Sequence, residues 1–218
     1  MSDKLKVGVL ISGRGSNLQA LLDACTAPDF PAEVVLVLSN KAGAYGLERA
    51  AKAGIATQVI NHKDFPSRIA FDDAMHEVLV AAGAEFICLA GFMRLLSVPF
   101  VDRWTDRLVN IHPSLLPAFK GLDVHQRVLD AGVRFTGCTV HIVRAELDDG
   151  PIIVQAVVPV RADDDTHTLA ARVLNAEHRC YPLALKLVAE GRVRIDGMRV
   201  HVDGAVAPDG ALVNPAIG

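Results

Sequence analysis

Short apolar segments alternate with helical segments along the first half of the chain, and this alternation limits the possible folds more than any other feature. The sequence predicts buried strands over 7–11, 34–38 and 55–60, with helices over 18–24 and 47–53 between them. A β-α-β-α-β order is typical of a parallel sheet whose right-handed crossovers place helices on both faces. We therefore expect an α/β fold with a Rossmann-like, doubly wound, mostly parallel central sheet.

The second half is expected to extend this sheet with strands that reverse direction. Further strands are predicted over 85–90, 108–112, 135–143 and 152–160, and helices over 67–82, 123–131 and 168–189. The short acidic turn at 144–151 returns the chain directly, which makes the C-terminal part antiparallel. Residues 91–99 are expected to form a loop. Asp196-Gly197 between two short β-rich segments is a hairpin signal.

Composition excludes several classes of partner. The chain has 218 residues, 51% of them hydrophobic, and a formal net charge of -3. This content is ample for a buried core, and the charge gives no basic surface for nucleic acid or an anionic membrane. No spanning helix or signal-peptide core is visible. The four cysteines form no C-x-x-C pair, so disulfides and a cysteine-bound zinc are not expected. We expect a cytoplasmic protein with small-molecule partners.

Two polar residues end the predicted strand at 108–112. Asn110 and His112 are two positions apart, so their side chains point to the same face, and Pro113 stops the ladder directly after them. In open α/β sheets this carboxyl edge is where ligands bind. An amide and an imidazole side by side suit acyl transfer, because they can stabilise charge that develops on a carbonyl oxygen. The alternative is a pair of ordinary polar residues at a turn.

A glycine-rich loop, 12–17, joins the first strand to the first helix. Glycines let the backbone approach an anion, and the helix N-terminus favours its charge. Leu18 occupies the place of the third glycine of a dinucleotide motif, and the second strand ends in Ser39-Asn40 rather than near an acidic residue. The pattern therefore favours a phosphate monoester over NAD. A tight turn that only starts a helix is the alternative.

Three other places could contribute to a site. Arg68 lies in the first turn of a predicted helix, where a cation opposes the dipole and suggests an anionic partner or a solvated side chain. The apolar segment 91–96 follows a strand and could wall a pocket or pack under a neighbouring helix. Asp148 and Asp149 stand in the acidic turn. A carboxylate there could position a water for proton transfer if the sheet brings it to His112, and is otherwise a turn residue.

Several segments together match one known family. They are Ile11–Ala20, Ser39–Ala42, Ala90–Arg94, Asn110–Pro117, Gly137–His141 and Leu147–Pro151. On these segments the sequence resembles the phosphoribosylglycinamide formyltransferases, folate-dependent enzymes that formylate an amine in purine synthesis. The resemblance covers almost everything before Arg192. It implies one formyltransferase domain over 1–218, with a phosphate-binding half at about 1–105 and a catalytic and folate-binding half at about 106–218.

The resemblance also implies roles for individual residues. The implied catalytic residues are Asn110, His112 and Asp148. The substrate, phosphoribosylglycinamide, is expected to place its phosphate on Gly15, Ser16 and Asn17 and its glycinamide part near Glu177. The co-substrate, 10-formyltetrahydrofolate, is expected to contact Met93, Arg94, Leu95, Leu96, Arg144, Ala145, Glu146 and Leu147, with Arg68 near its glutamate tail. No metal is implied. Because Asp149 stands beside Asp148, the sequence leaves open which of the two carboxylates takes part in catalysis. The chain is expected to be a monomer or a homodimer.

The sequence also leaves other functions open. Formyltetrahydrofolate deformylase would use a similar Asn and His pair with water in place of the amine. A transfer-RNA formyltransferase fits a longer and more basic chain. A nucleotide-binding module would need no catalysis, and a metallohydrolase could use His112, His141 and Asp148, although no short metal-ligand spacing supports it.

Overall fold

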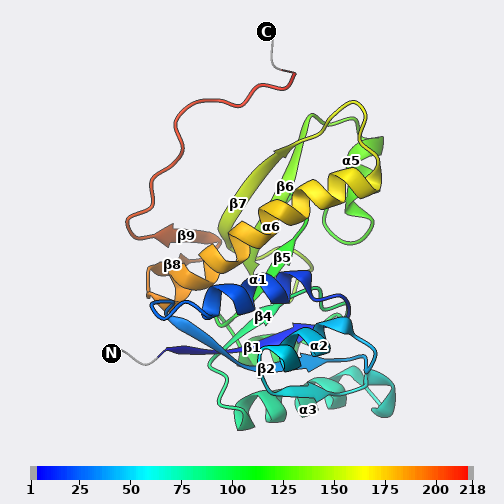
Figure 1. The fold of residues 1–218 in the computed structure, drawn as a ribbon, viewed down its shortest axis with the longest axis vertical. Coiled ribbons are helices and arrows are strands. Elements are labelled where there is room, and N and C mark those ends of the chain that lie inside the picture. Colours follow the sequence, from blue (N-terminus) through cyan, green and yellow to red (C-terminus); the bar gives the residue numbers. More distant parts are fainter. Residues whose placement is uncertain (1–3, 216–218) are drawn as a thin grey trace.

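The computed structural model describes residues 4–215, and its strands confirm the predicted α/β class. A seven-stranded sheet has the order β3-β2-β1-β4-β5-β6-β7 (Figure 1). Its strands are β1 Leu5–Ile11, β2 Ala32–Ser39, β3 Thr57–Val59, β4 Phe86–Leu89, β5 Leu108–His112, β6 Phe135–Ile142 and β7 Ile152–Pro159. β1 to β5 are parallel, whereas β6 and β7 are antiparallel to their neighbours. The parallel strands therefore all end at one edge.

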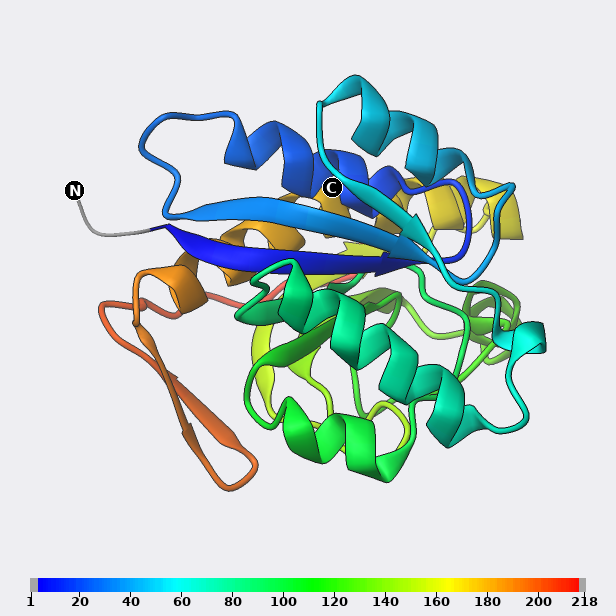
Figure 2. The same ribbon diagram turned by 90° about the horizontal axis from the view of Figure 1, so that it is seen from below.

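Helices cover both faces of this sheet (Figure 2). They are α1 Ser16–Cys25, α2 Tyr45–Lys52, α3 Arg68–Ala81, α4 Val98–Arg103, α5 Val124–Asp130 and α6 Thr166–Ala189, with a 3-10 turn, η1, at His62–Asp64. The side chains of α1, α2 and α6 share one buried apolar cluster with the sheet, and those of α3 and α4 share another. These two clusters are the two apolar layers that a doubly wound sheet requires.

The short helix α4 was not predicted from the sequence. The loop expected over 91–99 ends earlier, and Val98–Arg103 are helical. Pro99 lies in the first turn of this helix, where its missing N–H breaks no helical hydrogen bond. A helix of six residues is also too short to show a clear apolar period.

Helix α6 fixes the central strands close to the predicted site. The Tyr181 side chain is fully buried, and its hydroxyl lies 2.9 Å from the carbonyl oxygen of Leu89 and 3.3 Å from that of Val109. These carbonyls belong to β4 and β5, so one hydroxyl from α6 contacts both strands. Val109 directly precedes Asn110, and the contact therefore helps to set where that residue lies.

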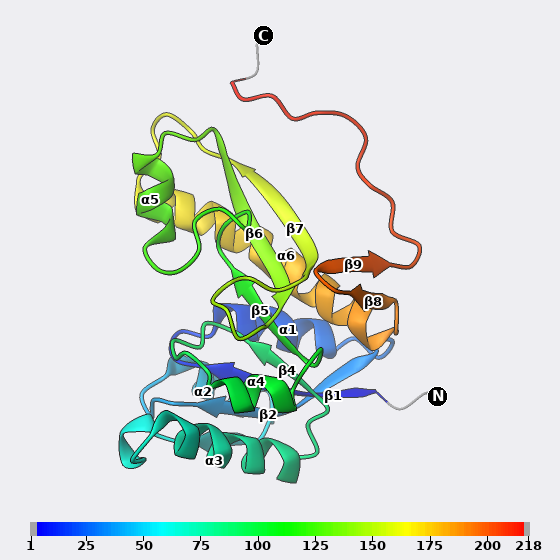
Figure 3. The same cartoon turned by 180° about the vertical axis from the view of Figure 1, so that it is seen from behind.

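The end of the described chain adds a small hairpin. Strands β8 Val193–Asp196 and β9 Arg199–Val202 pair antiparallel around Gly197, as the sequence predicted. Figure 3 shows this hairpin beside the C-terminal end of α6, away from the α3 and α4 layer. Between residues 4 and 215, no helix combines the length and the apolar character that crossing a bilayer would need.

Candidate active site

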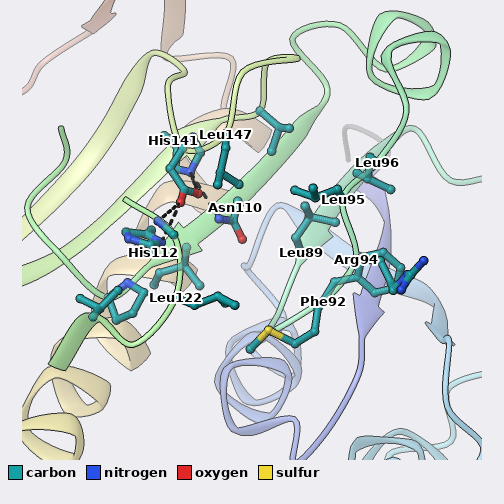
Figure 4. Close-up of a pocket in the computed structure, with 18 of the residues that line it drawn as sticks. Leu89, Phe92, Arg94, Leu95, Leu96, Asn110, His112, Leu122, His141 and Leu147 are labelled. Carbon is teal, nitrogen blue, oxygen red and sulfur yellow. Dashed lines mark hydrogen bonds and ion pairs between the residues drawn. The ribbon is translucent and has the colours of Figure 1, made fainter. Parts of the chain in front are cut away.

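The pairing of β5 with β6 sets the polar centre of the site. Asn110 lies opposite His141, and His112 lies opposite Thr139. Because alternate residues of a strand share a face, the amide and both imidazoles project from the same side of these two strands. Asn110 Nδ2 lies 3.3 Å from His141 Nε2 (Figure 4).

Asp148 reaches this cluster from the turn that follows β6. Its Oδ2 atom lies 3.4 Å from His112 Nδ1, and its Oδ1 atom lies 3.9 Å from His141 Nε2. The backbone N–H of Gly121 donates to Oδ2 at 2.9 Å, and the side chain is only 8% exposed. The structure thus brings Asp148 to Asn110 and His112, although the sequence places it far from both.

The turn has this shape because Gly150 allows the chain to return closely against β6. A Cβ atom at this position would lie 1.6 Å from the carbonyl oxygen of Ile142, which no side chain could tolerate. Asp148 itself has a φ of 50°, a left-handed conformation that Asp adopts more readily than most residues. The requirement for glycine and the unusual backbone at Asp148 both serve to aim one carboxylate at the imidazoles.

The two histidines have different hydrogen-bond partners. His141 Nδ1 lies 3.0 Å from the carbonyl oxygen of Ile142, so a neutral ring can donate there and accept from Asn110 at Nε2. Burial lowers the pKa of His141, in agreement with a neutral ring. His112 instead faces acceptors at both nitrogens, because Nε2 lies 2.9 Å from the Phe119 carbonyl oxygen and Nδ1 faces Asp148. Only the doubly protonated ring can donate to both.

His141 was not among the residues predicted for acyl transfer. The sequence showed that Thr139 and His141 alternate with buried residues, but it did not give the strand register that puts His141 opposite Asn110. Pairing the polar positions of the two predicted strands would have found it.

The neighbouring carboxylate of Asp149 points elsewhere. It forms an ion pair with Lys120, and its side chain is 47% exposed. Asp148 therefore faces the imidazoles, whereas Asp149 ties its turn to the loop that follows β5. The question that the sequence left open, which of the two carboxylates lies near His112, is answered by this geometry.

A pocket of about 830 Å³ opens beside the polar cluster. All the residues predicted to contact the folate line this pocket, apart from Arg68. They are Met93, Arg94, Leu95, Leu96, Arg144, Ala145, Glu146 and Leu147. In Figure 4, Arg94, Leu95 and Leu96 lie across the pocket from His112 and His141. Met93 and Leu95 are more than half exposed, although they are apolar. Such a large, mostly apolar cavity with a few convergent polar groups is typical of a small-molecule site.

Arg68 and His125 differ in their relation to the pocket. Arg68 begins α3 with an exposed side chain and is not among the residues that line the pocket. His125 on α5 does line it, and burial lowers the pKa of its imidazole. The sequence gave no reason to select His125.

The glycine-rich loop has the predicted strand, turn and helix arrangement. Gly15 precedes α1 in a left-handed conformation, with φ 69° and ψ 34°. A Cβ atom there would lie 2.7 Å from Gly46 Cα, so two glycines permit the loop to lie against α2. The first backbone N–H groups of α1, at Ser16 and Asn17, have no partner within the helix, which suits an anion.

Asn17 and Glu177 meet although 160 residues separate them. Asn17 Nδ2 donates to Glu177 Oε2 at 2.7 Å, across the contact between α1 and α6. Glu177 is 6% exposed, and its burial raises the pKa of the carboxyl group to about 7, partly opposed by the Asn17 hydrogen bond. Two residues predicted to bind different parts of one substrate are therefore in direct contact.

Within residues 4–215, no group of three or more His, Cys, Asp or Glu side chains is arranged to hold a metal ion. His112, His141 and Asp148 do lie together, but as a hydrogen-bonded and ion-paired cluster.

The fold and the site define an α/β protein that binds small molecules at the carboxyl edge of a parallel sheet. A family model described as "Formyl transferase" matches residues 5–185. The chain belongs to the formyl transferase family.

Individual relatives agree with this membership. The chain is 46% identical to "Phosphoribosylglycinamide formyltransferase" of Escherichia coli, over 94% of this chain and 96% of that protein. A crystal structure of "glycinamide ribonucleotide transformylase 1" from Symbiobacterium toebii has a TM-score of 0.91 and 49% identity, covering 93% of this chain and 95% of that one. "Trifunctional purine biosynthetic protein adenosine-3" of Gallus gallus is 56% identical over 89% of this chain, which spans only 19% of that protein.

The raised pKa of Glu177 predicts a specific dependence of stability on pH. The folded state keeps this carboxyl group protonated up to about pH 7, whereas the unfolded chain releases the proton near pH 4.5. The free energy of unfolding should therefore fall as pH rises from 4.5 to 7, by up to about 1.4 kcal/mol per pH unit from this group. In Glu177→Gln this part of the fall in the free energy of unfolding should be absent. Urea denaturation at pH 5, 6 and 7 measures it.

Glu48→Gln is the matched control, because Glu48 is an exposed carboxylate on α2. Its stability should follow the wild-type pH dependence. Parallel curves for wild type and Glu177→Gln would show that the buried carboxyl group does not titrate in this range.

Proposed function

We propose that this protein transfers the formyl group of 10-formyltetrahydrofolate to the amine of 5'-phosphoribosylglycinamide. The products are formylglycinamide ribonucleotide and tetrahydrofolate, and the step belongs to de novo purine biosynthesis. The single observation that carries the proposal is the convergence of Asn110, His112 and Asp148 beside the large pocket. Relatives that match nearly the full chain and carry the name of this activity support the choice of substrates.

The proposal places the two substrates on different parts of the sheet edge. The phosphate of the amine substrate binds the loop of Gly15, Ser16 and Asn17, and its glycinamide part lies near Glu177. These groups suit a phosphorylated amide, because free N–H groups face the anion and a partly protonated carboxyl group can both donate and accept. In this assignment the half at about 1–105 supplies the phosphate site and the half at about 106–218 supplies the chemistry.

The folate occupies the pocket between two walls. One wall is Met93–Leu96 and the other is Arg144–Leu147, both of which line the cavity. Their apolar side chains suit the flat ring system, and the formyl group then lies at the polar end, beside Asn110. Arg68 is proposed to attract the glutamate tail from outside the pocket, since its exposed cationic side chain suits an anionic partner.

The proposed mechanism is direct acyl transfer. The neutral amine attacks the formyl carbon, and negative charge develops on the formyl oxygen as the new C–N bond forms. Asn110 donates an N–H to this oxygen, and protonated His112 stabilises the charge from the adjacent position. The bond between the formyl carbon and the folate N10 then breaks. The proton lost by the amine passes to N10 through a water held by Asp148.

This mechanism needs no covalent intermediate on the protein. Holding the amine, the formyl carbon and the oxyanion donors in place converts a reaction between two substrates into one within a single complex. Asp148 serves two purposes in this account. It orients His112 through the contact between its carboxylate and Nδ1, and it holds the water that carries the proton of the attacking nitrogen to N10. We also propose that the protein works in the cytoplasm; whether it is a monomer or a homodimer stays a prediction.

An absorbance assay for tetrahydrofolate tests the proposed function. Wild-type protein given 10-formyltetrahydrofolate should produce tetrahydrofolate only when phosphoribosylglycinamide is also present, and the formylated product should appear in equal amount. Formate released at the same rate without the amine would identify a deformylase instead. Activity that chelators abolish would point to a metal-dependent reaction.

The two adjacent carboxylates give a sharper test of the site. Asp148→Asn should lower kcat by about 100-fold or more, because it removes the carboxylate that holds the water for proton transfer and the negative charge beside His112. Asp149→Asn makes the same chemical change one residue away, where it removes only an exposed ion pair with Lys120. Its kcat should stay within about threefold of wild type, and a larger loss in Asp149→Asn than in Asp148→Asn would reverse the assignment.

A further inference from the structure

One buried hydroxyl group connects the glycine-rich loop to the pocket wall. Ser12 directly follows β1 and is the first residue of the loop at 12–17. Its Oγ atom accepts a hydrogen bond from the backbone N–H of Met93 at 2.8 Å and donates one to Asn40 Oδ1 at 2.6 Å. Ser12 and Asn40 are both buried. The segments that follow β1, β2 and β4 therefore meet at this hydroxyl.

The wall of the pocket is held at both of its ends. The N–H of Met93 is bound by Ser12, and the N–H of Ser97 is bound by Asp72 Oδ2 at 2.6 Å. Asp72 is 1% exposed and comes from α3, so this second anchor has no connection to the glycine-rich loop. Between the anchors, Met93 and Leu95 turn exposed apolar side chains to the pocket.

The two hydrogen bonds that hold the wall, at Ser12 and at Asp72, belong to different parts of the fold. Gly13, the neighbour of Ser12, accepts from the Gly46 N–H at 3.0 Å, so the loop is held on its other side as well. A ligand that orders the loop would also fix the position of the Ser12 hydroxyl. The backbone N–H of Met93, which is bonded to this hydroxyl, would then be fixed as well. Buried hydrogen bonds of this kind resist breaking, because a lost partner leaves a polar group without water. Asp72 lies on α3, outside this set of hydrogen bonds.

We infer that Ser12 is a positioning residue that couples the two substrate sites. Binding of the phosphorylated substrate to the glycine-rich loop fixes the wall of the pocket in the shape that receives the folate. By thermodynamic reciprocity, folate in the pocket favours the loop arrangement that receives the phosphate. This inference rests on the proposed function, and it adds an interaction between the two sites that the chemistry alone does not require.

The test measures affinity for tetrahydrofolate by calorimetry, with and without saturating phosphoribosylglycinamide. Wild-type affinity should rise about fivefold or more when the amine substrate is present, which is within the usual range for coupled sites. In Ser12→Ala, phosphoribosylglycinamide should increase the affinity for tetrahydrofolate by less than about twofold, because Met93 loses its connection to the loop. A purely structural loss would weaken folate binding in both conditions and leave the ratio unchanged.

Asp72→Asn is the matched control. It weakens the other anchor of the same wall by replacing a charged acceptor with a neutral one. The affinity for tetrahydrofolate should fall by the same factor with and without phosphoribosylglycinamide. The ratio of the two affinities should therefore stay as in wild type. Ser12→Cys gives a second measurement in case Ser12→Ala does not fold, and its weaker thiol should also reduce the ratio.

The inference is overturned if wild type shows no enhancement, or if the folded Ser12 variant keeps the wild-type ratio. It is also overturned if Asp72→Asn loses the ratio as completely as Ser12→Ala does. Failure of the proposed function is seen separately, as wild-type protein that does not transfer the formyl group at all.

Discussion

The antiparallel pairing of β5 with β6 is the constraint on which the site depends. A strand can place Asn110 and His112 on one face, but only a partner in the correct register supplies His141 opposite the amide. The same pairing ends in the turn that carries Asp148 back to the imidazoles. A shift of one residue would turn every one of these side chains to the other face. The arrangement of the candidate site therefore depends on the register of these backbone hydrogen bonds.

The parallel part of the sheet contributes position rather than chemistry. Strands β1, β2, β4 and β5 end at one edge, which gathers Ser12, Asn40, the pocket wall and His112 from distant parts of the chain. The N-terminus of α1 and the α6 residue Glu177 then meet at the same edge. The glycine-rich loop and the apolar pocket thus share one support, and the Ser12 hydroxyl joins them through its hydrogen bond with the Met93 N–H.

The sequence could predict the fold and the places of several candidate site residues, because local patterns carry the strands and the family resemblance adds the residues. Alternating apolar segments specified the strands, and Asn110, His112 and the glycine-rich loop stood at their ends. Helix α4 was missed because Pro99 is tolerated in a first turn. The roles of His141, Ser12 and Asp72 depend on strand register and long-range packing, which no local pattern reports. For the same reason, the sequence could not separate Asp148 from Asp149, since only the turn geometry aims one inward and the other at Lys120.

A crystal structure of the protein with phosphoribosylglycinamide and tetrahydrofolate bound together is the most direct test of the central claim. We expect the substrate amine and the folate N10 to face each other beside Asn110, His112 and Asp148. Each should be close enough to bond one formyl carbon, with roughly 3 to 3.5 Å between reacting atoms. The phosphate should lie on Gly15–Asn17. An amine bound away from this cluster, or a folate outside the pocket, would contradict it.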